Sequence, residues 1–189
     1  GFRLRFILWT KEINDILKDY KANVNLDHSS FYIDVVAEDF AVTADMKISF
    51  YQYEIPEEYR YMFAFCDSEG NWYTLNRLPM GFRPSVEIMQ LICETVSLQP
   101  NAVQPSATIT TTDNNNNTIE ETIQLTCLRT KHRSWVDGFQ VAGTEEECRV
   151  VMEKIRKVSE YVGVTWKEGI QLLQDYEFIG IRFNHELHQ

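Results

Sequence analysis

Two periodicities of apolar residues divide the chain into predicted helices and strands. Apolar positions three or four residues apart give a helix one apolar face, and they occur at 10–21, from Pro84 to about residue 98, and at 144–162. Short alternating or continuous apolar runs are typical of strands, and they occur at 3–9, 32–36, 40–44, 61–65, 72–75 and 176–183, and twice more between 125 and 141. No βαβα repeat is present. The order predicts an α+β fold, in which an antiparallel sheet has helices on one face.

The predicted helices carry signals for their ends and for their buried faces. Thr144 and Glu147 form the T-x-x-E pattern of a capping box, and Gly163 is a residue that can end a helix. The buried positions expected on this helix are Val151, Ile155, Val158 and Val162. On the middle helix, which Pro84 can begin, they are Ile88, Ile92 and Val96. On the first helix they are Ile13, Ile16, Leu17 and Tyr20.

Turn residues separate several of the predicted strands. The polar segment 67–71 contains Gly70 and predicts a hairpin between 61–65 and 72–75. The dipeptide Asp137-Gly138 favours a tight hairpin turn between the two strands of 125–141. Residues 99–121 differ from the rest of the chain, because they are rich in threonine and contain four consecutive asparagines after Asp113. This composition predicts a solvated, mobile insertion.

Composition narrows the class of protein. The 189 residues are 44% apolar and 13% aromatic, which indicates a packed globular body. No apolar run approaches the ~20 residues of a membrane helix, so we expect no membrane partner. The four cysteines form no C-x-x-C pair, which disfavours a zinc site and favours free thiols. The net charge of −10 counts against a surface that binds nucleic acid everywhere, because neutralising phosphates requires clustered lysine and arginine.

The ends of the chain carry no targeting information. The sequence starts at Gly1 without an initiator methionine, an apolar signal segment or a transit pattern. We therefore expect a piece excised from a longer chain, located inside the cell in the nucleus or the cytoplasm, with no choice between the two.

Two aspartates lie in apolar, strand-like surroundings. Asp45 follows the run 40–44, and Asp137 lies within 135–139. Carboxylates at a strand end and a hairpin tip can meet across a sheet, where they repel each other unless a divalent cation lies between them. Mg²⁺ suits this position because it takes carboxylate, water and phosphate oxygens, and two such ions can stabilise both oxygens of a phosphoryl transfer. The ordinary alternative is that one aspartate ends a strand and the other makes a turn.

Six segments, in order from residue 5 to residue 183, resemble motifs of retroelement reverse transcriptases. Residues 5–14 resemble R-x-I-x-D-x-R-x-L-N, 45–52 resemble D-x-K-x-A-F/Y-x-Q, and 61–65 with 70–73 resemble T-A-F…G-x-Y-x-W/F. Residues 77–85 resemble R-L-P-F/Q-G-x-x-x-A/S, 135–143 resemble Y-V-D-D-I-L-V-x-G, and 178–181 resemble F-L-G. The L-P-M-G form is similar to elements of the long-terminal-repeat or tyrosine-recombinase type. Each motif alone is weak evidence for the family, whereas six motifs in the family's order are a strong resemblance.

The resemblance implies a palm, with an antiparallel sheet backed by helices, and a partial fingers subdomain. The fingers would comprise about 1–38 and 54–78, and the palm about 39–53 and 79–189 with the insertion at about 99–121. Thumb and nuclease parts would be absent. The implied activity is RNA-directed DNA synthesis, in which a primer 3′-OH attacks the α-phosphate of a deoxynucleoside triphosphate. Asp45 and Asp137 would be catalytic and would hold Mg²⁺ or Mn²⁺. The implied partners are a template–primer and the triphosphate, and the chain would be part of a polyprotein.

The resemblance also assigns roles to other residues. Those expected to contact the incoming nucleotide are Arg5, the backbone near Ile48 and Ser49, Phe50 beneath the sugar, and Met80 with Gly81 beneath the base pair. Those expected to contact primer or template are Arg83, Trp135, Ile179, Gly180 and Ile181. Arg77, Arg129, Lys131 and Arg133 are further candidates for phosphate contacts. The alternatives stay open: Phe50 as a core aromatic, Arg5 as a solvated strand residue, and the other cations as solvated surface charges.

The chain departs from the family pattern at the metal hairpin. Gly138 stands where the family has a second aspartate, and Trp135 replaces the usual tyrosine. Three hypotheses follow. The first is a polymerase. The second is a degenerate polymerase fold that only binds RNA or protein, which Gly138, the insertion and the net charge favour. The third is an unrelated α+β structural domain, which requires all six motifs to match by accident.

Overall fold

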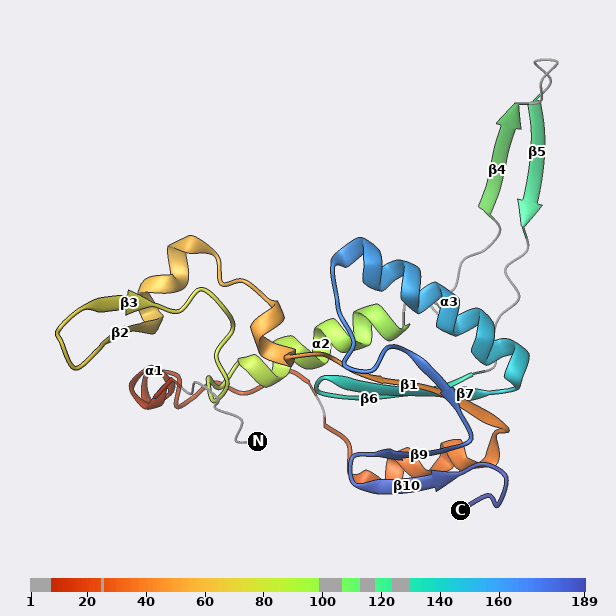
Figure 1. Ribbon diagram of the computed structural model, residues 1–189, viewed down its shortest axis with the longest axis horizontal. Helices are drawn as coiled ribbons and strands as arrows, with labels where there is room; N and C mark the ends of the chain where they lie inside the picture. The colour runs from red at the N-terminus through yellow and green to blue at the C-terminus, as the bar shows by residue number, and fades with distance from the viewer. Residues whose placement is uncertain (1–7, 25, 99–106, 113–117, 124–129) are drawn as a thin grey trace.

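The computed structural model describes residues 8–24, 26–98, 107–112, 118–123 and 130–189. Figure 1 shows two lobes of unequal size with helix α2 (Ser85–Leu98) leading from one to the other. We call the larger one the sheet lobe, which contains residues 29–47, 85–98 and 130–189. We call the smaller one the hairpin lobe, residues 54–77. Arg5, Cys127 and Arg129 lie outside the described residues, as does most of the strand expected at 3–9.

The sheet lobe is built on a four-stranded antiparallel sheet with the strand order β6-β7-β1-β8. Its strands are β1 (Phe40–Asp45), β6 (Lys131–Trp135), β7 (Gly138–Gly143) and β8 (Gln171–Leu173). The central pair, β1 and β7, is in register from Phe40 opposite Gly143 to Asp45 opposite Gly138. Every residue of β7 is buried, because helices cover one face of the sheet and further elements cover the other. The α+β class expected from the sequence is confirmed.

Helices α2 and α3 (Glu145–Val162) cover one face of the sheet and enclose the larger core. The predicted capping box is present, since the Thr144 hydroxyl accepts the Glu147 N–H at 3.3 Å and the Glu147 carboxylate accepts the Thr144 N–H at 3.1 Å. Gly163 ends the helix with φ of 76°. Two predicted faces need correction. Val162 of α3 is exposed, and the buried stripe of α2 is Met89, Cys93 and Val96, because Ile88 lies one position away and faces solvent.

The other face of the sheet is covered by η1 (Ser29–Ala37), β9 (Asp175–Phe178) and β10 (Ile181–Asn184). The strand expected at 32–36 is wrong, because this segment is a 3₁₀ helix. Its buried residues, Tyr32 and Val35, are three apart, which matches three residues per turn. The single strand expected at 176–183 is also wrong. It is a hairpin whose turn, Ile179-Gly180, has positive φ at both residues.

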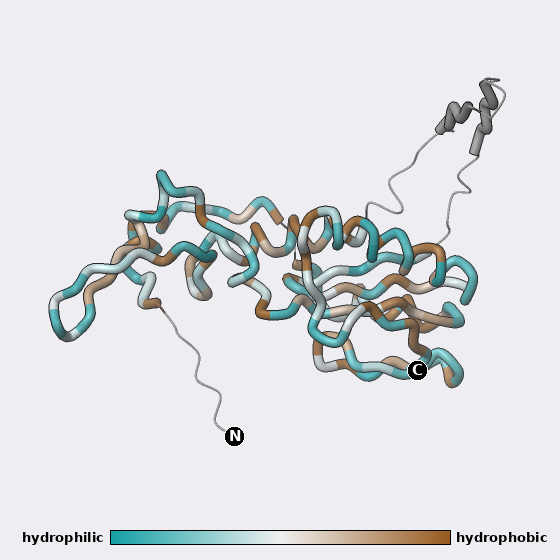
Figure 2. Tube along the Cα trace, turned by 45° about the horizontal axis from the view of Figure 1, so that its top comes forward, coloured by the Kyte–Doolittle hydropathy of each residue, from teal (hydrophilic) through white to brown (hydrophobic). Residues whose placement is uncertain are grey.

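The hairpin lobe contains η3 (Glu57–Phe63), β2 (Ala64–Cys66) and β3 (Trp72–Thr74). Its hairpin forms around 67–71 as the sequence predicts. The strand expected at 61–65 is wrong for its first three residues, which belong to η3, so that β2 begins only at Ala64. Figure 2 shows the hydrophilic tip of this hairpin at one end of the molecule. Helix α1 (Lys11–Ile16) lies close to the hairpin lobe in Figure 1 and is shorter than the predicted helix over 10–21. No residue of α1 is buried, so little packing supports a longer helix.

Two strands, β4 (Ala107–Thr112) and β5 (Thr118–Ile123), form a hairpin within the segment expected to be an irregular insertion. Among the described strands, each of these two pairs with the other and with no third strand. Among the described helices, none is long and apolar enough to cross a membrane.

Candidate active site

The end of β1 brings the two candidate aspartates to the same edge of the sheet. Asp45 is the last residue of β1 and lies opposite Gly138 in β7. Asp137 directly precedes Gly138, and its carbonyl oxygen accepts the Met46 N–H at 2.8 Å. The Asp45 carbonyl in turn accepts the Lys167 N–H at 2.8 Å, so backbone bonds fix the Asp45 position from both sides. Residues that are 92 positions apart in the sequence therefore meet where β1 ends and the chain turns into β7.

A cavity of about 590 Å³ opens at this edge. Asp45, Asp137 and Gly138 line one part of it, and Trp135 lines the part nearest the β6 end. The opposite side comes from β9 and the turn after it: Glu177, Phe178, Ile179 and Gly180. The structure thus brings together five residues that the sequence nominated, namely Asp45, Asp137, Trp135, Ile179 and Gly180. A smaller cavity of about 270 Å³ shares Asp45 and adds Lys167 and Glu168.

The surroundings of Asp45 disfavour the charged form of its carboxyl group. Burial raises the pKa of its carboxyl group above the usual 3.8, and the nearby negative charge of Asp137 raises it further. Lys167 acts in the opposite direction and Glu168 adds to the increase. The repulsion between the two aspartates is the arrangement that a bound cation would relieve.

This setting makes stability depend on pH, and Asp45→Asn isolates the effect. The folded protein holds the Asp45 proton more tightly than the unfolded chain, so its stability falls as the pH rises from 3.8 through the raised pKa. We expect Asp45→Asn to unfold at higher urea concentration than wild type at neutral pH without divalent cations. The difference should shrink as the pH falls through that window. Urea titrations over a pH series measure it; a difference that does not change with pH contradicts the assignment.

Gly138 leaves room for the Asp45 carboxylate. A Cβ atom at position 138 would lie 2.6 Å from Asp45 Oδ1 and 3.2 Å from Phe178 Cε2. Both distances are shorter than ordinary contacts, so any side chain there must displace the carboxylate and press on the ring. The surroundings of position 138 therefore fit glycine, the residue that departs here from the motif the sequence resembles.

The turn that carries Asp137 is strained and held from behind. The predicted turn Asp137-Gly138 needs correction, because Trp135 pairs with Gly138 and the turn residues are Val136 and Asp137. Val136 has φ of 52°, a conformation that costs a β-branched residue of the order of 1–3 kcal/mol. Gln90 of α2, which is 2% exposed, accepts the Val136 N–H at 2.5 Å and donates to Ser134 Oγ at 2.9 Å. This buried amide fixes the turn in place.

The chain after Asp45 forms a tight, left-handed turn. Ile48 and Ser49 have φ of 49° and 38°, and Ser49 begins the short 3₁₀ helix η2 (Ser49–Gln52), in which Phe50 packs partly against the core. Ser49 Oγ is buried and has no hydrogen-bond partner among the described residues. Gln52 holds this turn in place. Its amide N–H donates to the Lys47 carbonyl at 2.6 Å, and its amide oxygen accepts the Thr165 N–H at 2.8 Å. Consecutive left-handed residues of this kind can present backbone N–H groups to an anion.

Met80, Gly81 and Arg83 lie at a different place from the cavity. None of the residues lining either cavity beside Asp45 comes from 80–83. Gly81 has φ of 88°, and Asn14 of α1 fixes this turn by donating to the Gly81 carbonyl at 2.8 Å and accepting the Arg83 N–H at 2.9 Å. The Arg83 guanidinium donates to the carbonyl oxygens of Leu17 and Lys18 at 2.8 and 2.9 Å. Arg83 thus connects this turn to the end of α1.

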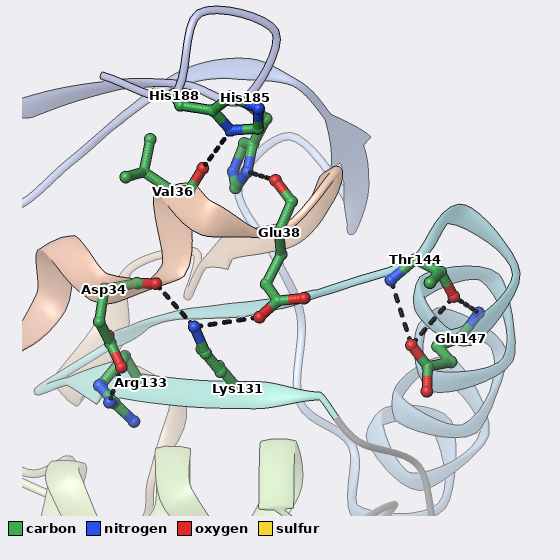
Figure 3. A network of polar contacts seen from close by, with 9 residues as sticks. All are labelled: Asp34, Val36, Glu38, Lys131, Arg133, Thr144, Glu147, His185 and His188. Atoms are coloured by element: carbon green, nitrogen blue, oxygen red, sulfur yellow. Dashed lines mark hydrogen bonds and ion pairs between the residues drawn. The ribbon is translucent and has the colours of Figure 1, made fainter.

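Three of the other cations nominated for phosphate contacts, Lys131, Arg133 and Arg77, are paired within the protein. Figure 3 shows Lys131 between the Glu38 carboxylate and the Asp34 carbonyl, with Arg133 beside the Asp34 carboxylate. The nitrogen–oxygen distances of the two ion pairs are 3.0 and 2.7 Å, and both fasten η1 to β6. Arg77 pairs with Glu54 at 3.0 Å. These contacts give the three side chains structural partners, whereas their role toward phosphates stays a prediction.

A chain of buried hydrogen bonds crosses the sheet behind the site. On the η1 side, Tyr176 donates to Gln140 Oε1 at 2.8 Å, and Gln140 donates to the Tyr32 carbonyl at 3.1 Å. The Tyr32 hydroxyl donates to the Ser134 carbonyl at 3.1 Å, next to the Gln90 contacts. His185 lies 3.3 Å from the Tyr176 hydroxyl at the far end. The turn at Val136 and Asp137 is therefore connected to both faces of the sheet.

The donors present suit a hard cation in type but are few in number. Asp45 and Asp137 supply carboxylate oxygens, which are the ligands Mg²⁺ takes together with water and phosphate. No group of three or more histidine, cysteine, aspartate or glutamate side chains arranged to hold a metal occurs among the described residues. Any cation here would take its remaining ligands from solvent or substrate.

Sequence reasoning missed the supporting residues. Asn14 and Lys167 hold the nominated residues Gly81 and Asp45 through bonds that span long stretches of chain. Gln90 in the same way holds Val136, which precedes Asp137, and Gln52 bonds Thr165. Gln52 and Asn14 had local signals, since Gln52 closes the segment that resembles D-x-K-x-A-F/Y-x-Q and Asn14 closes the one that resembles R-x-I-x-D-x-R-x-L-N. Nothing in the sequence near Gln90 indicates that its amide reaches across to the turn of another hairpin.

No family model and no curated protein matches this sequence. Solved structures do match. A foamy viral protease–reverse transcriptase in complex with double-stranded DNA aligns with 96% of this chain and 27% of its own, with a TM-score of 0.65 and 17% identity. A prototype foamy virus protease–reverse transcriptase mutant aligns with 87% of this chain and 19% of its own, at a TM-score of 0.61 and 18% identity.

A third such structure is the foamy viral enzyme in complex with an RNA/DNA hybrid. It aligns with 86% of this chain and 19% of its own, with a TM-score of 0.58 and 17% identity. The chain thus spans between 19% and 27% of the length of these three proteins. At such low identity the likeness concerns the fold, and the chain has a reverse-transcriptase-like fold.

Proposed function

We propose that this chain is the fingers-and-palm part of an RNA-directed DNA polymerase from a retroelement of the long-terminal-repeat or tyrosine-recombinase type. The observation that carries the proposal is the meeting of Asp45 and Asp137 at one cavity edge on a reverse-transcriptase-like sheet. The six ordered motifs add to it. The related solved proteins were studied with double-stranded DNA and an RNA/DNA hybrid, which supports a template–primer as the partner here.

In this proposal Asp45 and Asp137 hold Mg²⁺ or Mn²⁺. The bound ions would supply charge stabilisation for the attacking and leaving oxygens of nucleotidyl transfer. The chain's own contribution is orientation: backbone bonds fix Asp45, and Gln90 fixes the turn that bears Asp137. The left-handed turn at Ile48 and Ser49 would receive the triphosphate of a deoxynucleotide. Ile179 and Gly180 would support the primer end from across the cavity.

Primer extension tests this proposal on the full chain. The probe is a labelled oligo(dT) primer on poly(rA), supplied with dTTP and either Mg²⁺ or Mn²⁺. We expect extension by wild type, and a loss of about 100-fold or more in Asp45→Asn, because metal-borne charge stabilisation is worth several kcal/mol. Equal extension by wild type and Asp45→Asn would refute the assignment of Asp45.

A second candidate function is a degenerate polymerase fold that binds RNA or protein without catalysis. Gly138 favours it, since the site has two carboxylates where the family has three. The internal pairing of Lys131, Arg133 and Arg77 favours it as well. A wild-type chain that retains the labelled primer–template but does not extend it with either cation would support this candidate over the first.

A further inference from the structure

The face of β7 that carries Gly138 also carries Gln140. Side chains alternate along a strand. Phe139 and Val141 accordingly belong to the larger core under the helices, whereas Ala142 belongs to the core formed with η1, β9 and β10. Both Gly138 and Gln140 depart from the motif Y-V-D-D-I-L-V-x-G, which has aspartate and leucine at these two positions. The two departures therefore lie on one face of one strand.

The Gln140 amide is fully buried and is bonded at both ends. Its nitrogen donates to the Tyr32 carbonyl at 3.1 Å, and its oxygen accepts the Tyr176 hydroxyl at 2.8 Å. A carbonyl can only accept, so the nitrogen must face Tyr32 and the oxygen is left for the hydroxyl. Burying an amide is costly unless it is bonded in this way. Gln140 therefore favours one placement of η1 and β9 on the sheet.

Gly138 admits the same strand to the sheet. A Cβ atom at position 138 would lie 3.2 Å from Phe178 Cε2, so only a residue without a side chain leaves room for the ring as it lies. Phe178 follows Tyr176 by two residues in β9, as Gln140 follows Gly138 by two in β7. Strand β9 thus contacts β7 at two alternate residues, on the side of the sheet away from α3 (Figure 1).

The position of β9 decides the width of the candidate active site. Residues 177–180, which we call the cavity wall, line the cavity across from Asp45 and Asp137. Backbone bonds hold Asp45, and Gln90 holds the turn before Asp137 from the helix side. Those bonds leave the cavity wall itself unattached, whereas the bond from Tyr176 to Gln140 joins β9 directly to the strand that follows Asp137.

We infer that Gln140 is a positioning residue of this site: by bonding Tyr176 it fixes the distance between the cavity wall and the two aspartates. It touches neither a cation nor a substrate. The leucine of the motif could fill the same space but could not bond the hydroxyl. The inference rests on the proposed function in one respect, namely that the cavity wall supports the primer end. The placement of β9 does not depend on that function.

Amide hydrogen exchange, followed by NMR on the full chain, tests the placement. Gln140→Leu introduces the residue of the motif. Tyr176→Phe removes only the hydroxyl and keeps the ring, which stacks on Phe183 with 5.3 Å between centroids. In either variant we expect the amides of β9 and β10 to exchange about tenfold faster, because one buried bond is lost and a hairpin released from a sheet is only marginally stable. The amides of β1 and β7 should change much less.

Two comparisons show whether the effect belongs to this bond. The double variant Gln140→Leu with Tyr176→Phe should exchange no faster than Gln140→Leu alone, because both changes remove the same bond. Val158→Ala lowers stability from the larger core on the other face, so it should not favour exchange in β9 and β10. The same exchange pattern in Val158→Ala, or additive effects of the two changes, would overturn the inference. Tyr176→Phe alone decides it if Gln140→Leu does not fold.

Binding measurements relate the cavity wall to the proposed function. Gln140→Leu should bind Mn²⁺ as wild type does, since other bonds hold the two aspartates. It should bind a labelled oligo(dT) primer on poly(rA) about threefold more weakly, because a loosened wall must be ordered on binding. Val158→Ala should change neither. Unchanged primer–template binding by Gln140→Leu would overturn the positioning role. A wild-type chain that binds no primer–template would instead contradict the proposed function, and hydrogen exchange would still decide whether Gln140 places β9.

Discussion

Replacing Gln90 with leucine is expected to lower the free energy of unfolding by about 3 kcal/mol, because the change leaves buried polar groups unpaired. The Val136 N–H loses its acceptor, and Ser134 Oγ loses the amide that donates to it. Leucine is similar in size to glutamine, so the lost stability comes mainly from the unpaired polar groups and not from a cavity. Urea unfolding measures the change, and amide exchange at Val136 should become faster in the variant.

Two controls locate the effect of Gln90. Leu91→Ala alters the next residue of α2, which is exposed, and should change stability by no more than about 0.5 kcal/mol. Ser134→Ala removes one partner of the Gln90 amide and should cost about 1 kcal/mol. If Gln90→Leu proved as stable as wild type with unchanged exchange at Val136, the turn would not depend on this amide.

Gly138→Asp, which introduces the aspartate that the reverse-transcriptase motif has at this position, is expected to make stability depend on divalent cations. Without them, the new Cβ displaces the Asp45 carboxylate and approaches Phe178, and overpacking of this kind costs about 1–3 kcal/mol. A third negative charge adds repulsion to a site that already raises the pKa of Asp45. With Mn²⁺ present, the third carboxylate should strengthen cation binding by about tenfold, because affinity follows the number of charged ligands.

Gly138→Asn is the matched control for this variant, since it has nearly the same shape without the charge. It should be destabilised by the same steric contacts and should gain no stability from Mn²⁺. Thermal unfolding of both variants with and without Mn²⁺ compares them. A similar response of the aspartate and asparagine variants to the cation would show that position 138 does not face a cation site.

Segments with strong local signals could be predicted from the sequence. The capping box at Thr144, the stop at Gly163 and the buried positions Val151 and Ile155 follow from spacing alone, because a helix is specified by contacts within a few residues. The hairpin around 67–71 follows in the same way from its turn residues. The fold class needed only the order of such segments.

Segments whose conformation depends on distant partners could not be predicted. Residues 29–37 have strand-like composition, yet Tyr32 and Val35 turn toward the same sheet face in a 3₁₀ helix that Lys131 and Arg133 anchor. The sequence predicts the turn at Asp137-Gly138, one residue later than the observed turn at Val136 and Asp137. Glycine is typical of turns, but Gly138 pairs with Asp45 and therefore belongs to strand β7. The strained Val136 needs support from Gln90, which lies 46 residues away.

Within the candidate site, sequence motifs nominated the residues that face the cavity but not those that hold them. The family resemblance named Asp45 and Asp137, and the pairing of β1 with β7 brings their positions together. It also named Met80, Gly81 and Arg83, none of which lines that cavity, and the structure connects Gly81 and Arg83 to Asn14 of α1 instead. The relative placement of the two lobes depends on packing between segments that are far apart in the sequence. A motif within one segment cannot indicate that packing.

Electron paramagnetic resonance of Mn²⁺, titrated into wild type, Asp45→Asn and Asp137→Asn, tests directly whether the two carboxylates share a cation. Free Mn²⁺ gives the strong signal and bound Mn²⁺ a weak one, so no nucleic acid and no catalysis are required. We predict that wild type reduces the free signal and that each single substitution restores most of it. Equal depletion of free Mn²⁺ by all three proteins, or by none of them, would contradict the account.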